Sequence, residues 1–281
     1  MINEEVINGV IENAILEDIG DGDHSSQACI PADAMGKVQL LVKEAGIIAG
    51  VEIAKKVFES FDPQIQMEVF IADGAVVKPG DVAFVVEGKV LSLLKAERLI
   101  LNIMQRMSGI ATQTSVYVKR LEGLHTRILD TRKTTPGLRE IEKLAVKMGG
   151  GVNHRMGLYD MVMLKDNHID FAGGIAKAVA MVHDYLKKNN KNLKIEVEVR
   201  DFKELDEVLK VGGINRIMLD NFSPADTRKA VALIKGRFET ESSGGITLET
   251  IRDYAECGVD YISVGALTHH IKSLDLSLKA V

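Results

Sequence analysis

The stretch "IEVEVRDFKELDEVLKVGGINRIMLDNFSPADTRKAVALIKGRFETES", residues 195–242, contains three short β-rich runs separated by two helical patterns. The runs are IEVEV (195–199), RIMLD (216–220) and FETES (238–242). Apolar residues between them recur at helical spacing. Short strands that alternate with helices predict parallel strands joined by right-handed crossovers. The stretch therefore predicts an α/β fold.

The same alternation extends in both directions along the chain. Further strand candidates are RILD (127–130), MVMLK (161–165) and YISVG (261–265), and GGVNH (150–154) is a possible seventh. Six clear strands are fewer than a closed (β/α) barrel needs. We therefore expect an α/β barrel that is incomplete or open.

The residues before position 107 have a different character. They begin with an acidic amphipathic helix, expected over about residues 3–18, and continue with strand-like segments broken by Gly and Pro. Those segments are residues 37–46, 65–74 and 81–88, and a long helical stretch follows at 91–121. We predict a smaller α+β domain over residues 1–107 and an α/β barrel over residues 108–270.

Composition restricts the classes of function. The chain has 281 residues and a formal net charge of −5, which argues against a nucleic-acid partner. Its two cysteines, Cys29 and Cys257, have no CxxC or Cys/His ligand spacing, so we expect free thiols rather than a disulfide or a zinc site. The N-terminal residues have no basic segment followed by an apolar run. We expect a cytoplasmic protein with no membrane span.

Each predicted barrel strand ends on a polar residue or a glycine. These ends are Asp130, Lys165, Glu198, Asp220, Glu241 with Ser242, and Gly265. A single polar strand end usually only meets solvent. However, parallel α/β barrels build their active sites at the carboxyl ends of the strands, so the complete set predicts an active site there.

Cations are concentrated near the first of these strand ends. Residues 127–168 contain eight Lys or Arg and two His against five Asp or Glu, in an acidic protein. The cations that are not at helical spacing with one another are Arg132, Lys133, Arg155 and Lys165. Arginine matches a carboxylate or phosphate with a planar fork, and lysine supplies a mobile point charge. The four residues predict an anion-binding pocket.

A helix is expected between the first two cation clusters. Thr135 is its predicted N-cap, Pro136 lies in its first turn and Gly149 ends it. Lys143 and Lys147 are expected on the solvated face of this helix.

Two glycine-containing loops supply the complementary part of the site. ESSGG (241–245) and SVGALTH (263–269) each follow a strand and precede a helix, where barrels commonly bind a phosphate through backbone N–H groups. Between these loops and the cations lie Glu198 and Asp220, which are suited to a hydrated Mg²⁺ or to a developing positive charge.

Seven motifs resemble those of quinolinate phosphoribosyltransferase, also called nicotinate-nucleotide pyrophosphorylase (carboxylating). They are LDTRKTTPGLR (129–139), GGGVNHRMGLYD (149–160), KDNHI (165–169), EVEV (196–199), LDNF (219–222), ESSGGI (241–246) and GVDYISVGALTH (258–269). The resemblance covers nearly the whole chain. It implies a barrel preceded by an α+β domain that residues 271–281 rejoin, and a homodimer or higher homo-oligomer. It also implies Mg²⁺-dependent transfer of phosphoribosyl from phosphoribosyl pyrophosphate to quinolinate, with loss of CO₂.

The resemblance also implies roles for individual residues. Arg106, reaching across the subunit interface, and Arg132, His154 and Arg155 bind the quinolinate carboxylates. Lys133 and Lys165 extend toward the pyrophosphate, with Thr131 beside them. Glu198 and Asp220 hold the ribose hydroxyls and Mg²⁺, and together with Lys133 and Lys165 they are the predicted catalytic residues. The predicted phosphate-binding residues are Ser243, Gly244, Gly245, Val264, Gly265, Ala266 and His269.

Two alternatives remain open. A phosphoribosyltransferase-like protein associated with molybdate transport is related, but that branch lacks the equivalents of Asn153 and Lys165. A Schiff-base aldolase would also use a lysine at a barrel strand end, as Lys165 is, but it gives the arginines no role. One departure from the family pattern is Arg200, where an acidic residue is expected and where metal or hydroxyl contacts would change.

Overall fold

The computed structural model describes residues 3–281, which divide into two compact units interleaved along the chain. The first unit contains residues 3–116, 133–150 and 266–281, and the second contains residues 117–132 and 151–265. The predicted domain boundary at residue 107 stays a prediction.

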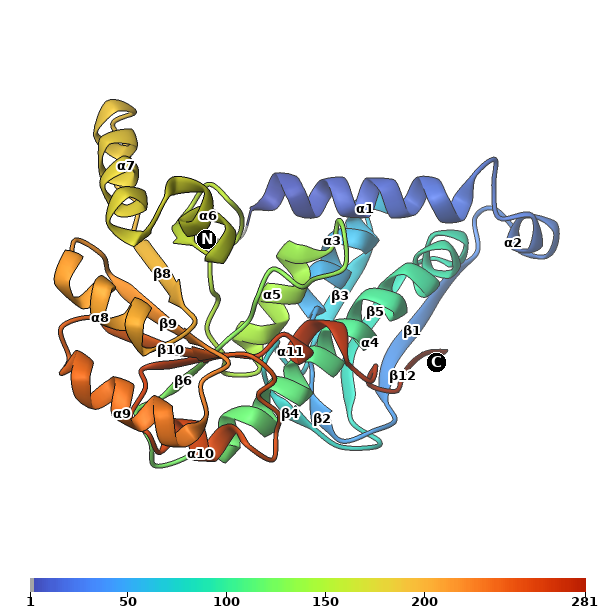
Figure 1. Ribbon diagram of the computed structural model, residues 1–281. Coiled ribbons are helices and arrows are strands. Elements are labelled where there is room, and N and C mark those ends of the chain that lie inside the picture. The colour runs from blue at the N-terminus through green and yellow to red at the C-terminus, as the bar shows by residue number, and fades with distance from the viewer. Residues whose placement is uncertain (1–2) are drawn as a thin grey trace. The chain divides into compact units, whose positions relative to one another are not determined.

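The first unit is built on a four-stranded antiparallel sheet of order β12-β1-β5-β3 (Figure 1). Its strands are β1 (Met35–Val42), β3 (Gln66–Val69), β5 (Val82–Lys89) and β12 (Leu276–Ala280), and β2 (Gly46–Ile47) pairs separately with β4 (Val76–Val77). In the β12–β1 ladder Leu278 lies opposite Leu40, and both side chains are buried. The last residues of the chain therefore rejoin the N-terminal sheet, as the resemblance implied.

Helices of the same unit pack against this sheet and form its core with it. They are α1 (Glu4–Ile19), α2 (His24–Cys29), α3 (Val51–Phe61), α4 (Val90–Arg120, whose last residues belong to the second unit), α5 (Arg139–Met148) and α11 (Ala266–His269). Phe58 of α3 meets Phe84 of β5 edge to face, with ring centroids 6.3 Å apart. The helices α1 and α4 confirm the two helices predicted over 3–18 and 91–121.

The second unit is built on a six-stranded parallel sheet of order β6-β11-β10-β9-β8-β7. Its strands are β6 (Arg127–Leu129), β7 (Val162–Leu164), β8 (Ile195–Val199), β9 (Arg216–Asp220), β10 (Glu239–Ser243) and β11 (Tyr261–Ser263). Its helices are α6 (Asp166–Ala172), α7 (Ile175–Lys188), α8 (Phe202–Val211), α9 (Pro224–Ile234) and α10 (Ile251–Ala255). All six predicted strands are confirmed.

The parallel sheet does not close on itself in the part of the chain that the structure describes. The strands β6 and β7 form its two edges. The possible seventh strand contributes only an isolated bridge from Val152 to Leu129. The predicted open α/β barrel is confirmed.

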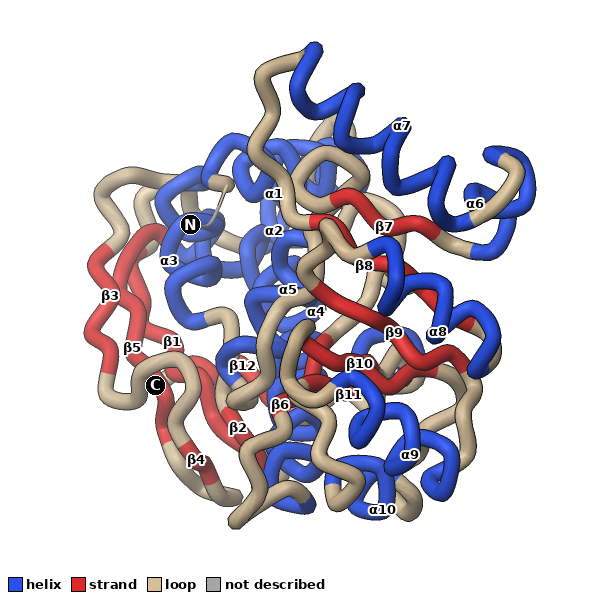
Figure 2. Tube along the Cα trace, turned by 60° about the vertical axis from the view of Figure 1, so that its left-hand side comes forward, coloured by secondary structure: helices blue, strands red, loops and turns tan. Residues whose placement is uncertain are grey.

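One face of the parallel sheet is apolar and packs against helices. Val197, Ile217 and Leu219 are completely buried in a cluster with residues of α7, α8 and α9, and Figure 2 shows α8 and α9 running alongside β9 and β10. Asp201 caps α8 by accepting the Glu204 N–H at 2.9 Å, so this helix begins with only two residues between it and the end of β8. The polar residues that alternate with the apolar ones must face the other side of the sheet.

The helix α5 differs from its prediction at its start and on one face. It begins at Arg139, because Thr135 to Leu138 form a turn in which the Leu138 N–H donates to the Thr135 carbonyl at 3.0 Å. Its predicted end at Gly149 is confirmed. Lys147 is exposed as expected, but the prediction for Lys143 is wrong, since that side chain is completely buried. The helices α1 and α11 contact α5, so less of its surface meets solvent than a peripheral helix would expose.

Two further predictions concern the chain as a whole. Cys29 and Cys257 are both free thiols, as predicted. No helix within residues 3–281 combines the length and the apolar character that a membrane crossing requires.

Candidate active site

Charged side chains line the face of the parallel sheet opposite the helices. They are Glu196 and Glu198 on β8, Arg216 and Asp220 on β9, and Glu239 and Glu241 with Ser243 on β10. The strand register places Glu196 and Glu239 on either side of Arg216, and Ser243 beside Asp220. Because directly paired residues share a face, these side chains lie on one face of the sheet, where Met218 is the apolar residue between Glu198 and Glu241.

Lys165 and Glu198 form an ion pair at the carboxyl edge of this surface. Lys165 Nζ lies 2.5 Å from Glu198 Oε2. The lysine side chain is 43% exposed, whereas the glutamate side chain is 10% exposed. The Lys165 backbone is fixed by His168, whose Nδ1 accepts the Lys165 N–H at 3.1 Å. Lys165 is thus a partly accessible ammonium held by an almost buried carboxylate.

A buried charge network occupies the interior of the same face. His154 Nε2 lies 3.0 Å from a Glu196 oxygen and 3.5 Å from a Glu241 oxygen. Arg216 Nη1 donates to Glu241 at 2.9 Å, and Arg216 Nη2 donates to Glu239 at 3.1 Å. Glu196 and Glu241 are completely buried, so these cationic partners compensate the desolvation of two carboxylates.

The protonation of His154 is subject to opposing influences. Burial lowers its pKa, but the hydrogen bonds and charges of Glu196 and Glu241 outweigh burial and raise the pKa to about 9. Burial and the charge of Glu241 raise the pKa of Glu196. One contact requires the neutral ring. The Arg155 N–H donates to His154 Nδ1 at 2.7 Å, and only an unprotonated nitrogen accepts a hydrogen bond. When the ring is neutral, this contact selects the tautomer in which Nε2 carries its hydrogen toward the carboxylates and Nδ1 accepts the Arg155 N–H.

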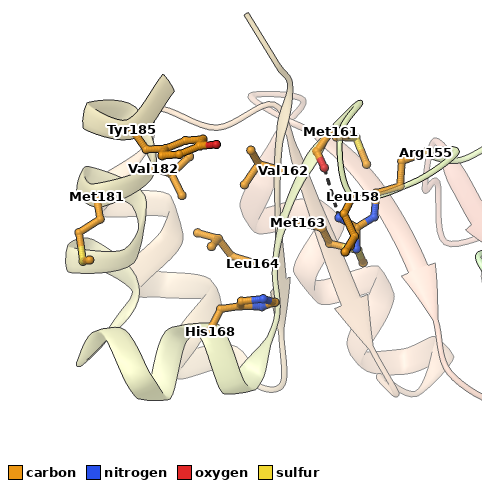
Figure 3. A pocket seen from close by; sticks show the side chains of 10 residues that line it. All are labelled: Arg155, Leu158, Met161, Val162, Met163, Leu164, His168, Met181, Val182 and Tyr185. Atoms are coloured by element: carbon orange, nitrogen blue, oxygen red, sulfur yellow. Dashed lines mark hydrogen bonds between the residues drawn. The ribbon is translucent and has the colours of Figure 1, made fainter. Parts of the chain in front are cut away.

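Arg155 lies beside an open pocket of about 520 Å³ at the edge strand β7 (Figure 3). The other residues that line it are Leu158, Met161, Val162, Met163, Leu164, His168, Met181, Val182 and Tyr185. Arg155 Nη1 donates to the Met161 carbonyl at 3.2 Å. Burial, followed by the charge of Arg132, lowers the pKa of Arg155. An anion bound near both guanidinium groups would relieve this repulsion.

The loops after β9 and β10 are locked together at the same edge of the sheet. The Asn221 N–H donates to the Ser243 carbonyl at 2.9 Å, and Asn221 Nδ2 donates to Asp220 Oδ2 at 2.8 Å. Gly244 has φ +98°, and a Cβ there would lie 2.2 Å from Asn221 Oδ1. Only glycine fits this position, because Asn221 approaches the backbone so closely.

Four predicted site residues, Arg106, Lys133, Ala266 and His269, belong to the first unit, and the others belong to the second. Arg106 donates from Nε and Nη2 to Oε1 of the buried Glu142, at 2.8 and 2.6 Å. Burial, the neighbouring His270 and then Lys133 lower the pKa of His269. His269 is therefore closer to Lys133 than their separation in the sequence indicates.

Two sets of side chains offer donor atoms for a metal ion. In the buried set, donor atoms of His154, Glu196 and Glu241 all lie within 4.8 Å of one another. His154 and the Arg216 guanidinium lie within ion-pair distance of these carboxylates and already offset part of their charge. Glu198 and Asp220 instead present carboxylate oxygens on the same face near the edge of the sheet, and Mg²⁺ binds to one or two carboxylates together with water and phosphate oxygens. The second set fits Mg²⁺ better.

Arg200 is the residue that departs from the family pattern, and its side-chain hydrogen bonds go to Glu204 and Asp170 rather than to the predicted metal ligands. Its guanidinium donates to Glu204 at 2.8 Å and to Asp170 at 3.1 Å. These two carboxylates raise its pKa, Glu204 first. The side chain therefore joins α6 to α8 on the exposed surface.

Comparison with known families identifies the relationship. The N-terminal domain of quinolinate phosphoribosyl transferase matches residues 23–108, and the C-terminal domain of the same enzyme matches residues 110–279. The chain belongs to the quinolinate phosphoribosyltransferase family. The resemblance inferred from the seven sequence motifs is thereby confirmed.

Individual quinolinate phosphoribosyltransferase relatives match over almost the whole chain. Quinolinate phosphoribosyltransferase [decarboxylating] 1b of Nicotiana tabacum is 48% identical over 97% of this chain and 82% of its own. The probable nicotinate-nucleotide pyrophosphorylase [carboxylating] of Bacillus subtilis is 41% identical over 99% of this chain and 94% of its own. Among solved structures, NadC from Streptococcus pyogenes superposes with a TM-score of 0.93 at 39% identity, covering 100% of this chain and 99% of that one.

Some residues of this quinolinate phosphoribosyltransferase site were not singled out from the sequence. Glu196 and Arg216 are part of the buried network, and Glu142 holds Arg106. The signal for the first two was the alternation of charged and apolar residues in IEVEV and RIMLD, which already implied a polar inner face. Glu142 gave no such signal, because its partner is 36 residues away in the sequence.

Proposed function

We propose that this chain transfers the phosphoribosyl group of phosphoribosyl pyrophosphate to the ring nitrogen of quinolinate, with decarboxylation. The products are nicotinate mononucleotide, pyrophosphate and CO₂, a step of de novo NAD synthesis. The observation that carries the proposal is the polar inner face of the parallel sheet, where Lys165 meets Glu198 at the carboxyl edge, in a chain that belongs to this family along nearly its whole length.

Electrostatics explains why an acidic protein has this cluster of cations. Quinolinate has two carboxylates, and its co-substrate carries a phosphate and a pyrophosphate, so the site must hold several negative charges at once. Arg132 and Arg155 repel each other in the absence of a ligand, as the lowered pKa of Arg155 indicates. We assign both, with Arg106 and His154, to the quinolinate carboxylates. His154 would act there together with Arg155, whose backbone N–H donates to His154 Nδ1 at 2.7 Å.

The chemistry requires positioning and charge stabilisation rather than a protein nucleophile. As pyrophosphate leaves, C1 of the ribose becomes oxocarbenium-like, and the carboxylates of Glu198 and Asp220 stabilise the positive charge. The pyridine nitrogen then forms its bond to C1 and becomes positively charged. As CO₂ departs, the electron pair of the C–CO₂ bond stays on the adjacent ring carbon, where the positive nitrogen stabilises it, and that carbon then takes a proton. Lys165 and Lys133, with Thr131 beside them, orient the leaving pyrophosphate.

The assignment of Mg²⁺ rests on donor chemistry. Glu198 and Asp220 would hold the ion, which supplies charge neutralisation for the pyrophosphate. Ser243, Gly244, Gly245, Val264, Gly265, Ala266 and His269 are assigned to the co-substrate's phosphate. The open space beside the exposed Gly245 supports this assignment.

The direct test of the proposed function is product formation. Purified protein is incubated with quinolinate, phosphoribosyl pyrophosphate and Mg²⁺, and nicotinate mononucleotide is measured by chromatography. We expect turnover that disappears when any one component is omitted. A folded protein that forms no mononucleotide would contradict the proposal.

The aldolase alternative is disfavoured by the state of Lys165. A Schiff-base lysine attacks as a neutral amine, usually in an apolar pocket or beside another cation. Lys165 Nζ instead donates to Glu198 Oε2 at 2.5 Å, so its partner is a carboxylate rather than an apolar pocket or another cation. Borohydride in the presence of a sugar phosphate should therefore trap no covalent adduct.

We also propose that the chain acts as a homodimer or a larger homo-oligomer in which Arg106 serves the partner's site. The test mixes two inactive variants, Arg106→Gln and Lys165→Ala, so that one hybrid site carries neither change. Glutamine at 106 retains a donor for the buried Glu142, which alanine would leave without its cation. Recovery of activity is expected, and hybrid dimers without any recovery would place Arg106 in its own chain's site or outside the site.

The cytoplasm is the proposed location. The names of several plant relatives specify mitochondria or the chloroplast, so fractionation of the source cells is the appropriate measurement. Enrichment of the protein with an organelle would contradict this proposal.

A further inference from the structure

Glu142 is a charged residue in an unusual position. Its side chain on α5 has no exposed surface at all. A buried carboxylate is strongly destabilising unless cations and hydrogen-bond donors surround it. Its contacts therefore indicate why the residue is present.

Both carboxylate oxygens of Glu142 are engaged, and each binds a different segment. Oε1 accepts two hydrogen bonds from Arg106 of α4, from Nε at 2.8 Å and from Nη2 at 2.6 Å. Oε2 accepts the backbone N–H of Thr135 at 3.2 Å. One side chain thus joins α4 to the loop of residues 133–138 that precedes α5, which we call the basic loop.

Further hydrogen bonds extend this connection to a third segment. Arg106 Nη2 also donates to Thr135 Oγ1 at 2.7 Å and to the Thr268 carbonyl in α11 at 3.3 Å. The hydroxyl of the buried Thr268 donates to the Lys133 carbonyl at 2.8 Å. Residues of α4, α5, α11 and the basic loop are therefore linked around a single carboxylate. All of these residues belong to the first unit.

We propose that Glu142 is a positioning residue that fixes the Arg106 guanidinium and the Lys133–Thr135 backbone together. It does not touch the substrate; it acts through Arg106 and the loop. The inference rests on the proposed function, because that function assigns Arg106 to a quinolinate carboxylate and Lys133 to the pyrophosphate. Bonds to Nε and Nη2 hold the plane of the guanidinium and leave Nη1 directed elsewhere, which is the arrangement expected for an arginine that presents one edge to an anion.

The chemistry of the contacts explains why a carboxylate is required. All three groups that face Glu142 in these bonds are N–H donors. A glutamine amide has only one acceptor oxygen, so its NH₂ group would face either the Thr135 N–H or the arginine donors. Glu142→Gln therefore preserves volume while it uncouples the loop from Arg106.

The test compares steady-state kinetics of Glu142→Gln, Arg106→Lys and the double variant, with Glu140→Gln as the matched control. Glu140 lies on the same helix and accepts the Asn3 N–H, outside the linked group. We expect Glu142→Gln to raise the KM for quinolinate by about 10-fold or more, on the scale of a small misplacement of a binding group. Glu140→Gln should leave the KM unchanged.

Coupling between the two residues separates positioning from mere structural support. In the Arg106→Lys background the further effect of Glu142→Gln on quinolinate KM should shrink to about threefold or less, because residues that act as a unit are not additive. A structural role alone would lower the melting temperature while each folded molecule kept its KM. Additive effects, or an unchanged KM in Glu142→Gln, would overturn the proposal.

Two further measurements keep the test decisive. If Glu142→Gln fails to fold, Thr135→Val removes only the Oγ1 acceptor of an exposed residue, and quinolinate KM should still rise by about threefold; no change would refute the positioning role.

Failure of the proposed function would instead appear as wild-type protein that does not use quinolinate. In that case amide hydrogen exchange decides, since Thr135 should exchange at least about 10-fold faster in Glu142→Gln than in wild type or Glu140→Gln, and equal rates would refute the inference.

Discussion

Replacement of Lys165 tests the site where two chemistries diverge. In the phosphoribosyltransferase mechanism Lys165 acts only through its charge, whereas in an aldolase its nitrogen forms a covalent imine. Lys165→Arg keeps the charge but replaces a compact ammonium with a wider planar fork. Lys165→Ala removes the charge and leaves Glu198 without this partner.

The structure gives the scale of the effect. Because Glu198 is 10% exposed and lies 2.5 Å from Lys165 Nζ, loss of the lysine removes a preorganised charge from a partly desolvated site. Removal of one such contact lowers the rate by about 10²–10³-fold, or roughly 2.7–4 kcal/mol of transition-state stabilisation. The effect on stability is smaller, about 1 kcal/mol, because the lysine side chain is 43% exposed and its charge is screened by water.

The assay is kcat at saturating quinolinate and phosphoribosyl pyrophosphate, with folding checked by circular dichroism. Lys165→Arg should retain measurable turnover, and Lys165→Ala should lose about 10²-fold or more. Lys210→Ala is the matched control, since it breaks an exposed lysine–carboxylate pair on α8, 2.5 Å from Asp206, and should leave kcat unchanged. Equal and complete loss in both Lys165 variants would refute the charge-only role.

Three other predictions address substrate choice, loop geometry and protonation. Nicotinate lacks one carboxylate and leaves part of the cation cluster unpaired. Its transition state should therefore be stabilised by about 2–5 kcal/mol less than that of quinolinate, and its kcat/KM should be lower by the corresponding factor; comparable turnover of both acids would contradict the assignment. Gly244→Ala should destabilise the protein by at least about 2 kcal/mol in urea titration, because its Cβ would lie 2.2 Å from Asn221 Oδ1, whereas Gly245→Ala, at φ +60° in open space, should cost only about 1 kcal/mol; equal losses would show that the clash is relieved. The pKa of His154 is raised from 6.5 to about 9, so its charge stabilises the fold fully below pH 6.5 and this stabilisation is lost as the pH rises through 9; the melting temperature of wild type should fall over that range relative to His154→Gln, and parallel curves would mean that the Arg155 N–H keeps the ring neutral.

Features that depend on local patterns were predictable from the sequence. The strands β8, β9 and β10 were recognisable because apolar residues alternate with polar ones or form short runs between helical segments. The Lys165–Glu198 contact follows from the same logic, since both residues end adjacent parallel strands. The open barrel was predictable because the chain supplies six clear strands.

Features that depend on distant partners were not predictable in this way. Thr135 and Pro136 have the residue types of a helix start, yet they lie in a turn whose Thr135 N–H is held by Glu142. Lys143 was expected in solvent because spacing within one helix does not show which other helices contact it, and α1 and α11 both contact α5. The burial of His154 against Glu196 was not predicted, because it depends on a strand that is 42 residues further along the chain.

The stoichiometry of the reaction tests the central claim most directly. Quinolinate labelled in its 2-carboxylate is supplied with phosphoribosyl pyrophosphate and Mg²⁺, and labelled CO₂, pyrophosphate and nicotinate mononucleotide are measured together. Equimolar release of all three is predicted, because ring substitution and decarboxylation are coupled in one site. Pyrophosphate released without mononucleotide, or mononucleotide that still carries the labelled carboxylate, would contradict the assigned reaction.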